Sequence, residues 1–265
     1  MTNYNQLFQE ALAIFNNKMG TDFSSQNIML CICKPNKFNS IRKQFIKEFS
    51  FEISDNNDNS ADTTLAEAFV YGINNNLPVS GIIIVERDKG TDAYEIMHTF
   101  LHELSHIFCV KNEIPSGRFY DDYCSDTSLS AENKIENGYY NAGYAIWREL
   151  VAELLSYSIL SPEPFGIDSV IADSDYYNTN IGSYNLLSKT ITSDLLVSLL
   201  LTEEAAMCSL SEFVRIVDNS PLSFVEELLK IVMLQLYKEQ FYKITSEFIF
   251  DLGVAYITML AKKSI

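Results

Sequence analysis

The sequence predicts an α+β protein whose strands lie near the N-terminus and whose helices fill the rest. Apolar, β-branched runs typical of buried strands occur at 28–33 and 79–85. Helical periodicity begins at about residue 93, and from 183 to 262 the chain reads as almost wholly helical, with breaks near 202 and 219–221. We therefore expect a small mixed sheet with helices, then a mainly helical C-terminal lobe.

The elements follow in order along three segments. Residues 1–90 form the predicted α/β lobe, with helices at 4–18 and 39–49 and strands at 28–33, 65–73 and 79–85. The turn-prone run Asn74-Asn75-Asn76 predicts a hairpin between the last two strands. Residues 91–160 hold a helix from about 93 that Asp92 can cap, a long polar connection at 111–141 and a helix at 143–160 that Pro162 and Pro164 end. Residues 161–265 form the helical lobe, and we expect all three segments to pack as one compact unit.

Composition excludes several classes of partner. The formal net charge of −16 over 265 residues opposes binding to nucleic acid or to an anionic membrane, because both need a basic surface. No apolar run is long enough to span a bilayer, and the N-terminus lacks the pattern of a secretory leader. Five cysteines without CxxC spacing predict reduced, structural thiols. We expect a cytoplasmic protein of open oligomeric state.

The segment TFLHELSHIF, residues 99–108, contains the H-E-x-x-H pattern. On a helix, His102 and His106 project from one face about 40° apart, so their ring nitrogens can converge on one zinc ion. Glu103 lies about 100° further round, where it can reach a water at the metal and act as a general base. This pattern predicts a zinc site with Glu103 as the catalytic residue.

Two observations favour a metal site over chance. All three histidines of the chain fall within residues 98–106, and the helix sorts into a polar and an apolar arc. The polar arc holds Glu95, His98, Thr99, Glu103 and His106, and the apolar arc holds Met97, Phe100, Leu101, Leu104, Ile107 and Phe108. A buried polar stripe needs partners, and a metal would supply one. His98 is expected to form a hydrogen bond or line the rim, since one straight helix cannot bring three successive turns, about 12 Å long, to one ion.

A catalytic zinc site needs a third protein ligand. Glu149 and Glu153 share one face of the predicted helix at 143–160 with small side chains, so this helix can approach the zinc helix closely. Glu149 is the predicted third ligand, and Glu153 would accept a hydrogen bond from the far nitrogen of His102. Glu153 as the ligand is one alternative. In another, both carboxylates pair with Arg148 and other cations on an exposed face.

Through His102, Glu103, His106, Glu149 and Glu153, together with the preceding strand, the chain resembles the gluzincin class of zinc metallopeptidases. Their pattern is H-E-x-x-H followed, on a later helix, by a ligating Glu with an acidic residue four positions on. The resemblance implies a zincin-like fold, a zinc cofactor and an edge strand at 82–85 that pairs with an extended peptide. Among compact members, the chain looks most like the bacterial and phage-type peptidases that cleave repressor proteins.

The expected function is hydrolysis of a peptide or protein substrate at zinc. Candidate substrate-binding residues are Ile82, Ile84, Tyr140 and Tyr157. An oxyanion donor would come from Tyr139, Tyr140, Tyr157 or Arg148. Two alternatives remain: a regulatory interaction protein that keeps a structural or vestigial zinc site, and a helical protein without metal.

Overall fold

The computed structural model describes residues 3–48, 65–69, 80–87, 91–115, 119–124, 131–160, 164–238 and 244–263. It confirms the α+β class, since the described residues are mostly helical and include one small mixed sheet. The chain divides into a sheet unit, residues 1–112 with 155–161, and a helical unit, residues 113–154 with 162–265. This division differs from the three consecutive segments expected from the sequence, because helix α5 (Ala131–Leu160) begins in the helical unit and ends in the sheet unit.

The sheet has three strands, β1 (Ile28–Cys33), β2 (Ala66–Phe69) and β3 (Ser80–Val85), in the order β1-β3-β2. Strand β3 is parallel to β1 and antiparallel to β2, as the expected hairpin requires. The predicted turn at 74–76 lies outside the described residues. The expectation that 82–85 forms an edge strand is wrong: β3 is central, and its backbone bonds are used by strands on both sides.

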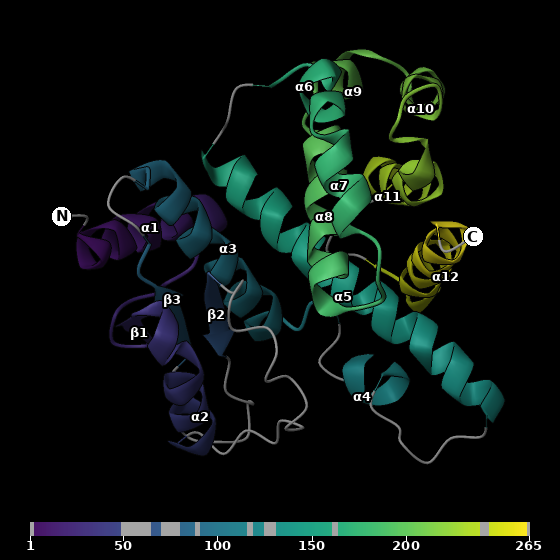
Figure 1. The fold of residues 1–265 in the computed structure, drawn as a ribbon. Coiled ribbons are helices and arrows are strands. Elements are labelled where there is room, and N and C mark those ends of the chain that lie inside the picture. Colours follow the sequence, from purple (N-terminus) through teal and green to yellow (C-terminus); the bar gives the residue numbers. More distant parts are fainter. Residues whose placement is uncertain are drawn as a thin grey trace. The chain divides into compact units, whose positions relative to one another are not determined.

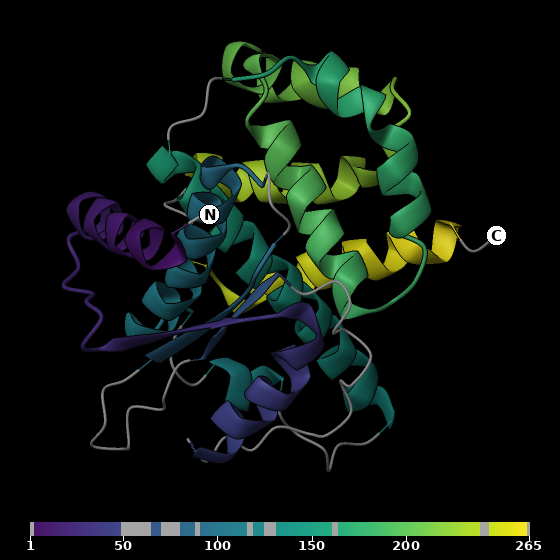
Figure 2. The same cartoon turned by 60° about the vertical axis from the view of Figure 1, so that its left-hand side comes forward.

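Helices cover both faces of this sheet. The alternating side chains of β3 divide between them, with Ile82 and Ile84 on one face and Ile83 and Val85 on the other. The first face packs on α1 (Tyr4–Met19) and α3 (Ala93–Lys111), and the second on α2 (Phe38–Glu48), which follows the short 3₁₀ turn η1 (Pro35–Lys37). Figure 2 shows α2 on the opposite side of the sheet from α1 and α3. Each isoleucine of β3 that is fully buried contributes about 1.5–3 kcal/mol.

The helical unit contains the first part of α5 and a series of further helices. They are α4 (Phe119–Tyr123), α6 (Ile167–Ala172), α7 (Ser174–Asn180), α8 (Leu186–Leu200), α9 (Glu203–Met207), α10 (Leu210–Asp218), η2 (Ser223–Val225), α11 (Glu226–Lys238) and α12 (Ser246–Lys263). Helix α8 is buried on nearly all sides, with Leu195, Leu196 and Val197 fully enclosed. The predicted helical character after residue 183 is confirmed.

Helix α5 begins at Ala131, twelve residues before the predicted start at 143, and Figure 1 shows it as one unbroken helix. Three asparagines, two tyrosines and Gly138 within 131–142 lower the local helix propensity of this segment. Tertiary packing overrides that preference. Tyr140 contacts the rings of Phe119, Tyr123 and Phe250, and Asn141 donates to the backbone oxygen of Cys124.

Two glycines allow α5 and α12 to cross closely. A Cβ at Gly143 would collide with the backbone oxygen of Ile249, and a Cβ at Gly253 would collide with that of Tyr139. Glycine is therefore needed at both positions for backbone approach. This contact fixes the middle of α5 within the helical unit.

The cysteines are free thiols, as expected. Burial raises the pKa of Cys33 and of Cys124 to about 11, so both stay protonated at neutral pH. Within the described residues, no helix combines the length and apolar character needed to span a membrane.

Candidate metal centre

Helix α3 places the two histidines through ordinary amphipathic packing. Asp92 caps its first turn, as the sequence indicates, by accepting a hydrogen bond from the N–H of Tyr94 at 3.1 Å. Its apolar face packs on α1 and the sheet, with Phe100 fully buried and its ring 5.3 Å from that of Phe8. This burial fixes the rotation of α3 about its own axis, and hence the direction of the polar arc.

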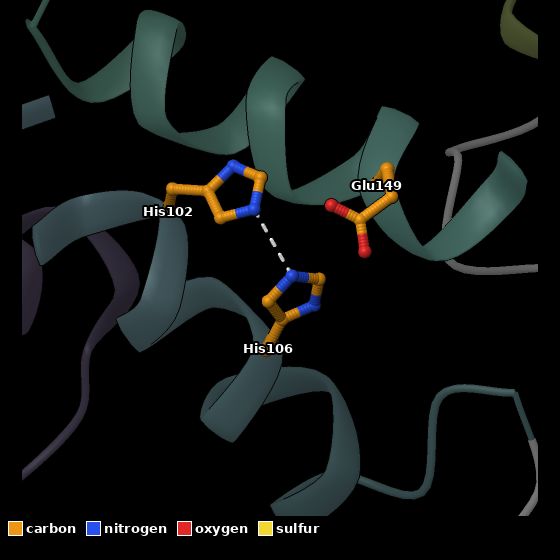
Figure 3. A group of neighbouring side chains, drawn as sticks. All are labelled: His102, His106 and Glu149. Carbon is orange, nitrogen blue, oxygen red and sulfur yellow. Dashed lines mark hydrogen bonds between the residues drawn. The ribbon is translucent and has the colours of Figure 1, made fainter. Parts of the chain in front are cut away.

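The imidazoles of His102 and His106 meet edge to face, with centroids 4.7 Å apart and an interplanar angle of 83°. Their Nε2 atoms are 3.1 Å apart. Two nitrogens that bind one tetrahedral zinc, each at about 2.0–2.1 Å, are separated by about 3.3 Å. In the structure the two rings share a hydrogen bond at this separation, drawn dashed in Figure 3, and the separation is also close to the value for two ligands of one ion.

Glu149 completes the group. It offers a carboxylate oxygen, and this atom and one nitrogen from each of His102 and His106 all lie within 4.8 Å of one another. In Figure 3 the carboxylate, carried by α5, points toward the two rings of α3. Glu149 lies six residues before Leu155, so about 9 Å of unbroken helix joins it to the part of α5 that belongs to the sheet unit. Two imidazoles and a carboxylate form a donor set that could hold a metal ion.

The two remaining acids of the sequence pattern lie on the same helices. Glu103 is buried, with 6% of its surface exposed, on the turn that joins the two histidines. Glu153 is half-buried one turn after Glu149. The hydrogen bond predicted between Glu153 and the far nitrogen of His102 is not formed in this structure: Nδ1 of His102 and Oε2 of Glu153 are both buried, and neither atom makes a hydrogen bond.

His98 is a hydrogen-bonding residue, as expected from the sequence. Its Nε2 lies 3.0 Å from Oγ of Ser156, a fully buried serine near the end of α5. The ring of Tyr157 packs against the His98 ring at 4.4 Å between centroids. Tyr157 therefore lies beside the polar arc of α3, one helical turn before His102.

The structure does not bring the other candidates to this place. Ile82 and Ile84 are fully buried in the core under α1 and α3, so the substrate-binding role expected for them is wrong. Tyr140 belongs to the aromatic cluster of the helical unit, and burial, followed by the nearby charge of Glu136, raises its pKa. On an ideal helix it lies on the side of α5 opposite Glu149. Arg148 is exposed, its guanidinium 5.9 Å from the ring centroid of Tyr144.

The sequence pattern did not indicate Arg87, which follows the central strand and reaches the polar arc of α3. Its Nη2 donates to Oγ1 of Thr99 at 2.6 Å, and its backbone N–H donates to the hydroxyl of Tyr4 at 2.9 Å. Thr99 precedes Glu103 by four residues and shares its side of the helix. Arg87 thus places a mostly buried cation, 14% exposed, one turn from the buried acid. The one feature of the sequence that could have pointed to Arg87 is its position two residues after a buried strand.

No family model matches the chain, and comparisons with curated proteins and with solved structures find no match. The site is therefore interpreted from its own geometry and chemistry.

Proposed function

We propose that this protein is a zinc-dependent peptidase of the gluzincin type, with a zincin-like arrangement of its metal-binding helix. The observation that carries the proposal is the convergence of His102, His106 and Glu149 from two helices on one point. Two imidazoles, one carboxylate and an open position form the donor set of catalytic zinc in several peptidases. Glu103 on the intervening turn supports peptidase chemistry over a purely structural site, because a closed structural site needs no adjacent buried acid.

Each residue of the group has its own proposed role in metal binding or proton transfer. His102, His106 and Glu149 would hold zinc. When bound, zinc would polarise the carbonyl of the substrate and lower the pKa of its water to about 7. Glu103 accepts the proton of the attacking water and passes it to the leaving amine. Arg87 adds a mostly buried positive charge to the polar arc of α3, the arc that also carries Glu103.

The direct test is metal content combined with the substitution Glu103→Gln. Both proteins should hold one zinc per chain, because Glu103 is not a ligand. The variant should cleave a peptide library about 10²–10⁴ times more slowly, the usual contribution of a general base. Hydrolysis by the wild type that a chelator abolishes and zinc restores would complete the case.

Two results would reject the peptidase. Zinc retained by both proteins without cleavage by either would favour the interaction protein with a vestigial site. Purified protein that holds no zinc, and gains no thermal stability when zinc is added, would favour the protein without metal.

A further inference from the structure

The bond between His98 and Ser156 lies on the two helices that carry the metal-binding side chains. His98 precedes His102 and His106 by four and eight residues on α3, and Ser156 follows Glu149 by seven residues on α5. Their polar atoms are 3.0 Å apart. Along α3 the two histidines lie about 6 Å and about 12 Å from His98, and along α5 Glu149 lies about 10.5 Å from Ser156. The His98–Ser156 bond and the metal group are therefore two separate connections between the same two helices.

The surroundings of this bond leave little freedom. Ser156 has none of its surface exposed, and the Tyr157 ring covers the other partner at 4.4 Å. Ile159, one turn further on, is buried in the same core as Phe100 and Leu101 of α3. All these residues belong to the sheet unit.

A shift of α5 by one residue would move its side chains by about 1.5 Å along the axis and about 100° around it. Such a shift would break the bond to His98 and turn the carboxylate of Glu149 away from the imidazoles. Generic apolar packing is more tolerant of such a slip than a buried hydrogen bond with one geometry.

We propose that His98 and Ser156 are positioning residues that set the register of α5 on α3 and so place Glu149 beside His102 and His106. This inference rests on the metal site of the proposed function, but not on peptidase activity. It assigns to the third histidine of the cluster a role in building the centre without binding the ion.

The test measures metal binding in the full chain. Zinc affinity is determined by competition with a chelating dye, and cobalt(II) absorption in the visible region reports the ligands around the ion. Ser156→Ala should weaken zinc binding by about 10–100-fold, the usual effect of losing a group that orients a ligand, and should shift the cobalt spectrum toward that of Glu149→Ala. His98→Gln keeps a polar amide and should retain more affinity than His98→Leu.

Ser105→Ala is the matched control. Ser105 is also a fully buried serine, but its hydroxyl bonds within α3, to the backbone oxygen of Leu101 at 2.7 Å. It should lose thermal stability comparably to Ser156→Ala while keeping the wild-type cobalt spectrum. If Ser156→Ala fails to fold, the comparison of His98→Gln with His98→Leu decides the question.

Wild-type zinc affinity and an unchanged cobalt spectrum in Ser156→Ala, or equal affinities of His98→Gln and His98→Leu, would overturn the positioning role. A wild-type protein that binds no zinc would overturn it together with the metal site. A wild-type protein that binds zinc without cleaving peptides would remove the peptidase alone, and weakened zinc binding in Ser156→Ala would then still support the positioning role.

Discussion

Helices α3 and α5 both contribute to the candidate metal centre, but different forces place them. Helix α3 lies wholly within the sheet unit, and one apolar face against the core determines where its histidines point. Helix α5 belongs to both units, crosses α12 at two glycines, and meets His98 through Ser156. A pair of ligands on one helix needs only the helix itself, whereas a ligand from a second helix needs a defined register.

The largest expected effects come from removing one predicted ligand from each helix. His106→Ala and Glu149→Gln should each weaken zinc binding by about 70–900-fold, since about 10–16 kcal/mol for a zinc site shared among four ligands gives about 2.5–4 kcal/mol each. Glu153→Gln should cost less, about 10–100-fold, if it only orients His102. Competition with a chelator measures the zinc affinity of each of the three purified variants and so ranks their losses. A larger loss for Glu153→Gln than for Glu149→Gln would make Glu153 the ligand.

A second pair of variants separates the tyrosines of α5. If the hydroxyl of Tyr157 is the oxyanion donor, as the sequence allows, Tyr157→Phe should lower kcat by about 10²-fold; its ring, on α5, packs against His98 of α3 one turn before His102. Tyr140→Phe should change kcat by less than about twofold, since Tyr140 packs in the aromatic cluster of the helical unit. Steady-state kinetics on one peptide substrate gives the kcat values of Tyr157→Phe and Tyr140→Phe for this comparison. Equal kcat values for Tyr157→Phe and wild type would exclude the donor role.

The smallest expected effect concerns stability, and two glycines of α5 test it. Gly143→Ala should destabilise the protein by about 1–3 kcal/mol or more, because the new methyl group would collide with the α12 backbone. Gly138→Ala is the control: nothing lies within 4 Å of its Cβ position, so alanine should stabilise by about 0.5–1 kcal/mol. Urea unfolding at one temperature gives the free energy of unfolding of both variants. A neutral Gly143→Ala would show that α5 and α12 do not cross as closely as described.

Local patterns predicted much of this molecule because local forces govern those parts. The strands at 28–33 and 80–85, the cap at Asp92 and the helices after 183 follow from apolar periodicity and capping chemistry. Local pattern does not predict the start of α5 at Ala131, because aromatic packing of Phe119 and Phe250 on Tyr140 stabilises a segment with poor helix propensity.

The helical repeat is enough to predict that two imidazoles of α3 face one point, because it puts residues four apart on one side. The acidic face of a later helix predicts that a carboxylate, Glu149 or its alternative Glu153, lies near this pair. Only the tertiary structure shows that β3 is central and that Arg87 reaches Thr99. It likewise shows that Ser156 contacts His98 and that Glu149 faces the histidine pair. These contacts join residues about 12–60 positions apart in the chain, and such contacts depend on packing between elements, which no local repeat encodes.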